Sequence, residues 1–242
     1  GDPDGAGDYN VFIGELAGGI GTQTDDADYN VGIGFRALAD LTTGESNIAI
    51  GGYTSENITT GHANVAIGSW DDSTYQGAMA QNSVSSFCVA IGSGALRLVN
   101  EDDNDGSVAV GYGALNNQAG TGGAQFANAT TAVGYKSLTA LTTGASNTAV
   151  GYLALTGLVT GIGNTAVGYQ AANALGNAEQ YNTSIGFGSM RDFDEGTGGS
   201  DINDNVALGY DALRGADLQA VDVQVSGNIA IGTSTLAGTA AN

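Results

Sequence analysis

The chain has 242 residues, with 25 acidic against five basic residues and a formal net charge of −20 at pH 7. This charge repels nucleic acid and anionic membrane surfaces, and we expect neither as a partner. No run approaches the ~18 consecutive apolar residues of a membrane-spanning helix, so membrane insertion is not expected either. The 41 glycines and the single proline occur without a break in composition, which predicts one repeat domain over residues 1–242.

A five-residue phrase recurs along the whole chain. It consists of an asparagine-like residue, a β-branched residue, a small residue, an aliphatic residue and a closing glycine, and its clearest copies are residues 147–151 and 164–168. Successive copies lie 17 to 24 residues apart, so the basic unit has 17 residues and the longer intervals contain insertions. Fixed periods of this size are typical of solenoids. The closing glycines are Gly14, Gly34, Gly51, Gly68, Gly92, Gly111, Gly134, Gly151, Gly168, Gly186, Gly209 and Gly232.

Each phrase alternates as a β-strand does, with β-branched and aliphatic residues on one face and asparagine-like and small residues on the other. We expect the aliphatic column, from Ile13 to Ile231, to form a core one strand wide. The closing glycine predicts either φ > 0 or a close approach of the next coil. An aromatic residue and a leucine often follow it, which predicts a second short strand with two further ladders. The sequence therefore predicts an all-β, parallel β-solenoid of about twelve coils, each with two short strands and two turns.

The small residue at the centre of the phrase leaves the strand apolar or small on both faces. One face can fill the coil, and the other needs a partner because a two-strand coil encloses little volume. We therefore expect copies of this chain to pack together along the solenoid axis, with a homotrimer as the economical arrangement. An end-to-end filament is the alternative, since the first and last coils expose strand edges.

Stretches of extra residues separate several phrases, at residues 22–29, 71–87, 99–106, 116–129, 191–204 and 215–227. We assign all of them to the interval between the leucine segment and the next phrase, so they should project from one edge of the solenoid. Aromatic and amide side chains suit sugar stacking and hydrogen bonding. The alternative is a set of irregular loops that bind no ligand. The candidate ligand-binding residues are Trp70, Tyr75, Gln76, Gln125, Phe126 and Phe193.

Acidic residues cluster in three loops, a composition that suits a hard cation such as calcium, and the calcium candidates come from the first two; the third cluster is Asp192, Asp194, Glu195, Asp201 and Asp204. None of the loops matches a complete calcium-binding pattern, and a solvated acidic surface is the alternative. The sequence indicates no other cofactor. The candidate calcium ligands are Asp2, Asp4, Asp8, Asp102, Asp103 and Asp105.

The polar columns of the repeat favour structural roles. Stacked asparagines predict an amide ladder between coils rather than a functional array. A rank of threonines of the kind found on ice-binding surfaces shares its column with valine and isoleucine, which favours a core or interface position. These threonines are Thr131, Thr148, Thr165 and Thr183.

Residues for catalysis or redox chemistry are scarce. Cys88 is the only cysteine and replaces the asparagine of its phrase, so we expect a buried, inert thiol. His62 is the only histidine, and no serine–base arrangement accompanies it. We therefore expect no enzymatic activity and assign no catalytic residue.

The phrases at residues 147–152 and 228–232 resemble the head repeats of trimeric autotransporter adhesins and the related repeats of phage tail fibres. The resemblance covers nearly the whole chain. It implies a left-handed parallel β-roll, trimeric about its axis, in an extracellular fibre on a virion or a cell surface. The chain departs from the family's strict period, because six intervals run from 19 to 24 residues.

On these grounds the expected function is that of an extracellular fibre module, in a phage tail fibre or a bacterial adhesin head, that attaches to a glycan or a cell surface. The alternative is a purely structural subunit of a self-assembling extracellular filament with no specific receptor.

Overall fold

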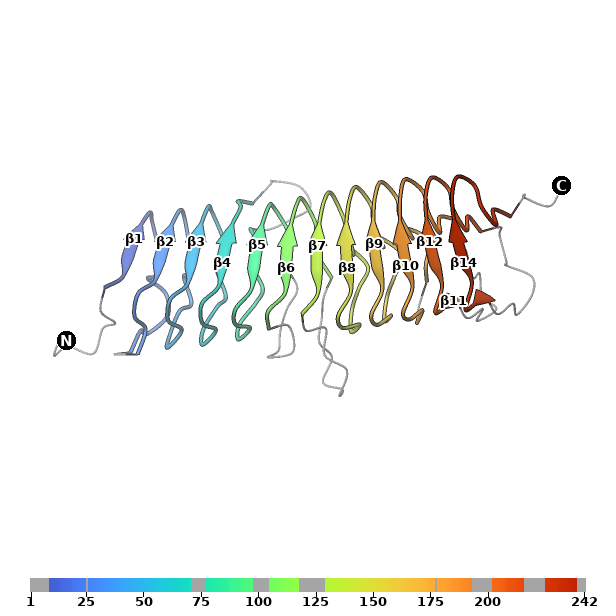
Figure 1. Ribbon diagram of the computed structural model, residues 1–242. Coiled ribbons are helices and arrows are strands. Elements are labelled where there is room, and N and C mark those ends of the chain that lie inside the picture. The colour runs from blue at the N-terminus through green and yellow to red at the C-terminus, as the bar shows by residue number, and fades with distance from the viewer. Residues whose placement is uncertain are drawn as a thin grey trace.

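The chain forms a rod of stacked coils in the computed structural model (Figure 1). The structure describes residues 9–24, 26–70, 77–97, 105–117, 129–176, 178–192, 202–215 and 225–238. Within these ranges all the regular structure is β-strand, and no helix occurs.

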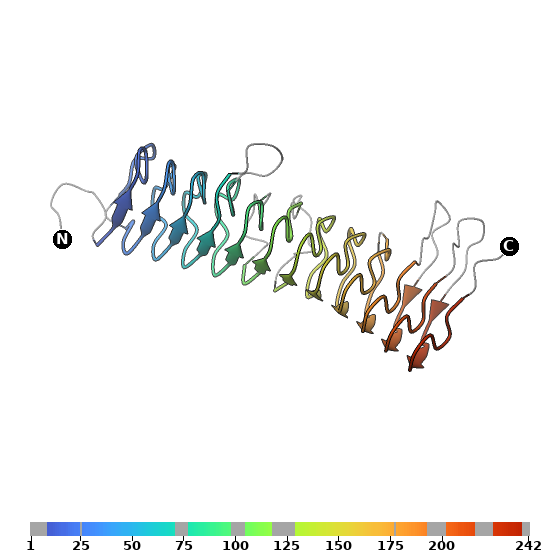
Figure 2. The same ribbon diagram turned by 90° about the horizontal axis from the view of Figure 1, so that it is seen from above.

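One parallel sheet of twelve strands runs the length of the rod, with β1 at one end and β14 at the other (Figures 1 and 2). Each strand is the three-residue centre of one phrase, and neighbouring strands pair in register, as Thr148 with Thr165 and Val150 with Val167. The predicted parallel β-solenoid is therefore confirmed. The strands are β1 (Val11–Ile13), β2 (Val31–Ile33), β3 (Ile48–Ile50), β4 (Val65–Ile67), β5 (Val89–Ile91), β6 (Val108–Val110), β7 (Thr131–Val133), β8 (Thr148–Val150), β9 (Thr165–Val167), β10 (Thr183–Ile185), β12 (Val206–Leu208) and β14 (Ile229–Ile231).

The core of the rod consists mainly of alanine and leucine. The central residue of the phrase points inward, and Ala149 and Ala166 have no exposed surface. Opposite them lie the leucines that follow the closing glycine, of which Leu138 and Leu155 are also fully buried. The expectation of an aliphatic core column was wrong, because residues such as Ile50 (37% exposed) lie on the outside of the sheet. The coil is thin enough for alanine to fill the strand side of the interior, so the larger side chains face outward.

The second strand expected in each coil was also wrong. Within the described residues the segment after the closing glycine forms turns. Its second and fourth residues have left-handed backbone conformations, for example Lys136 (φ 51°) and Leu138 (φ 50°). A left-handed residue at every second position prevents an extended strand. The leucine ladder itself is confirmed, since these turns direct the leucine side chains into the core.

The sequence predicted a positive φ or a close approach at the closing glycines; all but Gly68 have φ > 0, and all but Gly232 lie close to the backbone of the next coil. Gly34 has a φ of +132°, and a Cβ there would lie 2.5 Å from the carbonyl oxygen of Gly51 in the next coil. Any side chain at this position would therefore push neighbouring coils apart as well as strain the backbone.

An amide ladder joins the coils, as the asparagine column predicted. Nδ2 of Asn164 donates to Oδ1 of Asn147 at 3.1 Å, and Nδ2 of Asn182 donates to Oδ1 of Asn164 at 3.0 Å. Each amide also donates to a backbone carbonyl, as Asn164 does to Glu179 at 2.7 Å. These asparagines are buried, so the ladder satisfies polar groups that water does not reach.

The insertions do not all occupy one place in the coil. Residues 77–79 already belong to a coil, because Ser55 N–H donates to the Ala78 carbonyl oxygen and Met79 N–H to the Ala95 carbonyl oxygen. Met79 is fully buried at the leucine position, so the extra residues of this interval precede the leucine segment. The assignment of every insertion to the interval after the leucine was therefore wrong. Two others contain strands, β11 (Ile202–Asn203) and β13 (Val225–Ser226), which pair in parallel.

Candidate functional surfaces

The outward side chains of the twelve strands form a continuous strip, which we call the outer sheet face. It contains two columns that run along the rod, and its residues are aliphatic except for four threonines. None of them is charged. The columns are Val11, Val31, Ile48, Val65, Val89, Val108, Thr131, Thr148, Thr165, Thr183, Val206 and Ile229, and Ile13, Ile33, Ile50, Ile67, Ile91, Val110, Val133, Val150, Val167, Ile185, Leu208 and Ile231.

The outer sheet face is long, regular and solvent-exposed in the single chain. Twelve strands at about 4.8 Å per step give it a length of about 53 Å. Its side chains are almost all β-branched and hence stiff at χ1, and exposures near 37% recur along it, as at Ile48 and Ile91. Soluble single chains rarely expose apolar patches larger than a few hundred Å². For the threonine rank, a core position is excluded because Thr148 and Thr165 point outward with their strand neighbours.

A second surface consists of stacked aromatic rings that directly follow closing glycines. Their centroids lie 4.8 to 5.6 Å apart and their planes differ by 5° to 13°, so the rings form one parallel stack. The predicted aromatic ladder is thus confirmed in this part of the rod. We call this stack the aromatic ladder, and it consists of Tyr112, Tyr135, Tyr152, Tyr169, Phe187 and Tyr210.

Trp70, a predicted ligand-binding residue, belongs to a separate aromatic group nearer β1. Its ring meets Tyr53 edge-on at 5.0 Å, and Tyr53 meets Phe35 in the same way at 5.2 Å. Arg36 lies 6.0 Å from the centre of the Tyr53 ring. Trp70 is half exposed and remains a candidate contact for a ligand. The other five predicted ligand-binding residues, Tyr75, Gln76, Gln125, Phe126 and Phe193, lie outside the described residues.

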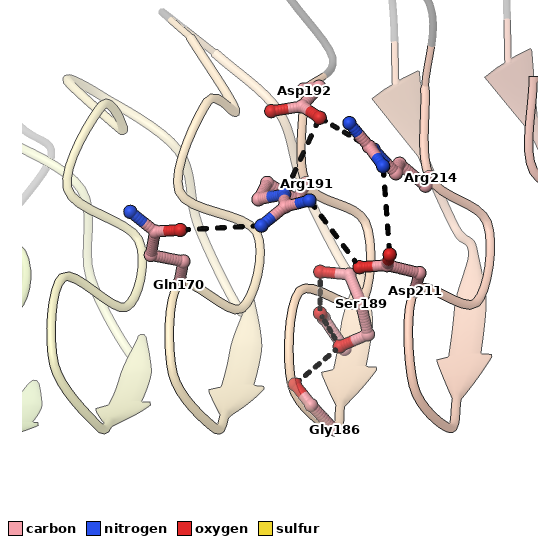
Figure 3. Close-up of polar contacts among 8 residues, drawn as sticks. Gln170, Gly186, Ser189, Arg191, Asp192, Asp211 and Arg214 are labelled. Carbon is pink, nitrogen blue, oxygen red and sulfur yellow. Dashed lines mark hydrogen bonds and ion pairs between the residues drawn. The ribbon is translucent and has the colours of Figure 1, made fainter. Parts of the chain in front are cut away.

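Ion pairs join two successive coils in the second half of the rod, and a hydrogen bond extends the cluster to the coil before them (Figure 3). Arg214 contacts Asp192 at 2.7 Å and Asp211 at 3.6 Å, and Arg191 contacts the same two carboxylates at 3.4 and 3.7 Å. Arg191 also donates to Gln170 at 3.5 Å. The hydrogen bond to Asp192 raises the pKa of Arg214. Two cations and two anions balance here, so the cluster links coils and leaves no net charge for a ligand.

The predicted calcium sites gain no support from the described residues. Asp105 is the only one of the six candidates inside the described ranges, and its Oδ1 accepts a hydrogen bond from Ser86 N–H at 2.6 Å. Asp2, Asp4, Asp8, Asp102 and Asp103 lie outside them. Among the described residues, no group of three or more histidine, cysteine or acidic side chains could hold a metal ion. Calcium binding at the remaining positions stays a prediction.

An acidic depression of about 430 Å³ lies beside the first coils and was not predicted. It is lined by Asp26, Asp28, Thr43, Glu45 and His62. Glu45 N–H donates to Nδ1 of His62 at 3.3 Å, so the single histidine serves in a coil-to-coil contact. The repeat could have indicated this depression, because Asp28, Glu45 and His62 each lie two positions before the asparagine of a phrase and so share one column along the rod.

Cys88 is buried as predicted, and its Sγ lies 3.4 Å from the Ser86 carbonyl oxygen. Burial raises the pKa of this thiol from its ordinary value of 9.0 to about 12. We expect thiol reagents to modify Cys88 only after unfolding. Because the folded chain holds this proton more tightly, its contribution to stability is complete below pH 9.0 and is lost as the pH rises towards 12. Urea unfolding of the wild type and of Cys88→Ala across this range measures the effect, and equal pH slopes would contradict it.

Comparison with models of known protein families, with curated proteins and with solved structures gives no match. The fold itself defines the class of protein, an all-β parallel β-solenoid built from sequence repeats. Over the described ranges, no helix has the length and apolar character needed to cross a membrane.

Proposed function

We propose that this chain is a rod-shaped module of an extracellular fibre, in a phage tail fibre or a bacterial surface adhesin, that associates with further copies of itself and mediates attachment to a glycan or a cell surface. The observation that carries the proposal is the outer sheet face, an uncharged and largely aliphatic strip along the whole rod. The resemblance of the repeat phrase to adhesin heads and tail fibres supports the extracellular location and a left-handed coil.

The outer sheet face supports self-association for two reasons. Its apolar surface is favourable to bury, at roughly 25 cal/mol per Å². Its uniform columns make it self-complementary along the rod, so identical copies can pack with their axes aligned. A closed ring buries this strip on every copy at once, and a homotrimer is the arrangement that the resemblance favours.

Native mass spectrometry and analytical ultracentrifugation of the purified chain test the association. We expect a trimer, and a stable monomer would contradict the proposal. Val150→Asp brings a carboxylate into the centre of the strip, where association would bury it without a partner. An unpaired buried polar group costs about 1–3 kcal/mol, which is enough to weaken association about tenfold or more. Ile20→Asp is the matched control, because Ile20 is an exposed aliphatic residue outside the outer sheet face and should leave the trimer intact.

Attachment is tested with an array of neutral and charged glycans probed with the labelled protein. Binding to a defined set of glycans is the expected result, and binding to none would contradict the glycan part of the proposal.

The alternative function is a structural filament subunit. β1 and β14 are the edge strands of the sheet and carry the same phrase, so β14 of one copy has the right pattern to pair with β1 of the next. Cryo-electron microscopy without imposed symmetry separates the two. Discrete trimers support the fibre module, and continuous end-to-end filaments support the structural subunit.

A further inference from the structure

We infer that the aromatic ladder binds a neutral, linear β-1,4-linked polysaccharide that lies parallel to the rod, with one sugar at each coil. This inference rests on the proposed attachment to glycans and specifies the site and the class of sugar. It moves the glycan site from the insertion loops to the regular surface of the coils.

The rings of the aromatic ladder lie beside the outer sheet face rather than within it. The chain bends at the closing glycine, and each ring belongs to the residue directly after that bend. Self-association through the sheet is therefore compatible with a free ladder. Tyr135, Tyr152 and Tyr169 are 41%, 43% and 42% exposed.

The stacking decides which part of each ring can meet a ligand. Neighbouring rings are nearly parallel at 5.2 Å, so they cover each other's faces, and the ring edges and hydroxyl groups remain accessible. The side chains of Tyr135, Tyr152 and Tyr169 make only ring contacts and, at Tyr135, a contact with Lys136, so among the described residues their hydroxyl groups have no hydrogen-bond partner. The ladder therefore presents a row of hydroxyl groups that can both donate and accept, at nearly equal intervals.

The interval matches an extended polysaccharide. In an extended β-1,4-linked chain of hexopyranoses, each sugar advances by a distance close to the 5.2 Å that separates the rings. A sugar chain laid along the ladder thus stays in step with it, and each sugar beside a tyrosine can reach one phenolic hydroxyl, whereas the sugar beside Phe187 meets only a ring edge. Helical or branched glycans lose this match after one or two units.

The charge of the ladder favours a neutral chain. The residues that directly follow its rings are Gly113, Lys136, Leu153, Gln170, Gly188 and Asp211. Asp211, the one carboxylate among them, pairs with Arg191 and Arg214, and Lys136 lies 5.4 Å from the Tyr135 ring. None of these six residues thus carries an unpaired carboxylate, while the net charge of −20 repels polyanionic glycans.

The triple variant Tyr135→Phe, Tyr152→Phe and Tyr169→Phe tests the inference. It removes three hydroxyl groups and keeps the stack, because Phe187 already occupies one position between Tyr169 and Tyr210. We expect unchanged thermal unfolding. Each lost hydrogen bond costs about 0.5–1.5 kcal/mol, so the dissociation constants for cello-, chito- and manno-oligosaccharides should rise by roughly tenfold or more. Calorimetry measures them. Tyr181→Phe is the control, since Tyr181 is 58% exposed and lies outside the ladder.

Chain length provides a second measurement. Affinity should increase as the oligosaccharide lengthens towards one sugar per ring of the ladder, and an affinity independent of length would overturn the inference. So would a triple variant that binds as the wild type does. If the wild type ignores these probes but binds other glycans on the array, the ladder inference fails and the proposed attachment stands. If it binds no glycan, the glycan attachment fails as well.

Discussion

Gly151→Ala is expected to destabilise the chain by about 2–6 kcal/mol. Gly151 has a φ of +142°, a region that only glycine occupies readily, which costs other residues about 1–3 kcal/mol. A Cβ there would also lie 2.7 Å from the carbonyl carbon of Gly168 in the next coil, and overpacking of this kind costs about 1–3 kcal/mol more. Urea unfolding followed by circular dichroism measures the loss.

Gly106→Ala is the matched control for this substitution. Gly106 also has a positive φ, of +73°, but a Cβ there would meet nothing within 4 Å. Only the left-handed strain of about 1–2 kcal/mol remains. Equal losses for the two variants would show that contact between coils does not explain the closing glycine.

The repeat made the architecture predictable, and one failure concerns which side of the strand faces inward. Alternation places Ala149 and Val150 on opposite faces of the strand but does not say which face is inside. The larger hydrophobic residue usually marks the core, so the column of Val150 was expected there. Here the leucines opposite the strand, such as Leu155, leave room only for alanine. The amide ladder could be predicted from Asn147 and Asn164, since buried amides at a fixed spacing have few other partners.

The candidate surfaces were less predictable than the fold. The aromatic residues after the closing glycine were recognised as a ladder, but the parallel stacking of Tyr152 on Tyr169 depends on a turn whose left-handed residues the sequence does not mark. Leu138 and Leu155 adopt that conformation although they are bulky, because the coil over-determines their backbone. The same turn chemistry explains why a second strand was expected where none forms among the described residues.

Asn164→Ala is the second substitution with a large expected effect, a loss of about 2–6 kcal/mol in the free energy of unfolding. Oδ1 of Asn164 accepts from both the backbone N–H and Nδ2 of Asn182, each at 3.0 Å, and its Nδ2 donates to the Glu179 carbonyl. Truncation leaves the Asn182 N–H and the Glu179 carbonyl buried without this partner. Each unpaired buried group costs about 1–3 kcal/mol. Urea unfolding measures the change.

Asn228→Ala separates the cost of an unpaired group from the cost of losing an amide side chain. Asn228 is the last rung of the ladder and donates from its backbone and from Nδ2 to Asn205, each at 3.0 Å, while itself only half-buried. Water can replace its contacts, so the loss should stay within about 0.5–1.5 kcal/mol. Equal losses at Asn164 and Asn228 would mean that stability comes from the local turn at each asparagine. A loss concentrated at Asn164 would mean that it comes from the continuity of the ladder, in which each amide satisfies the coil that follows it.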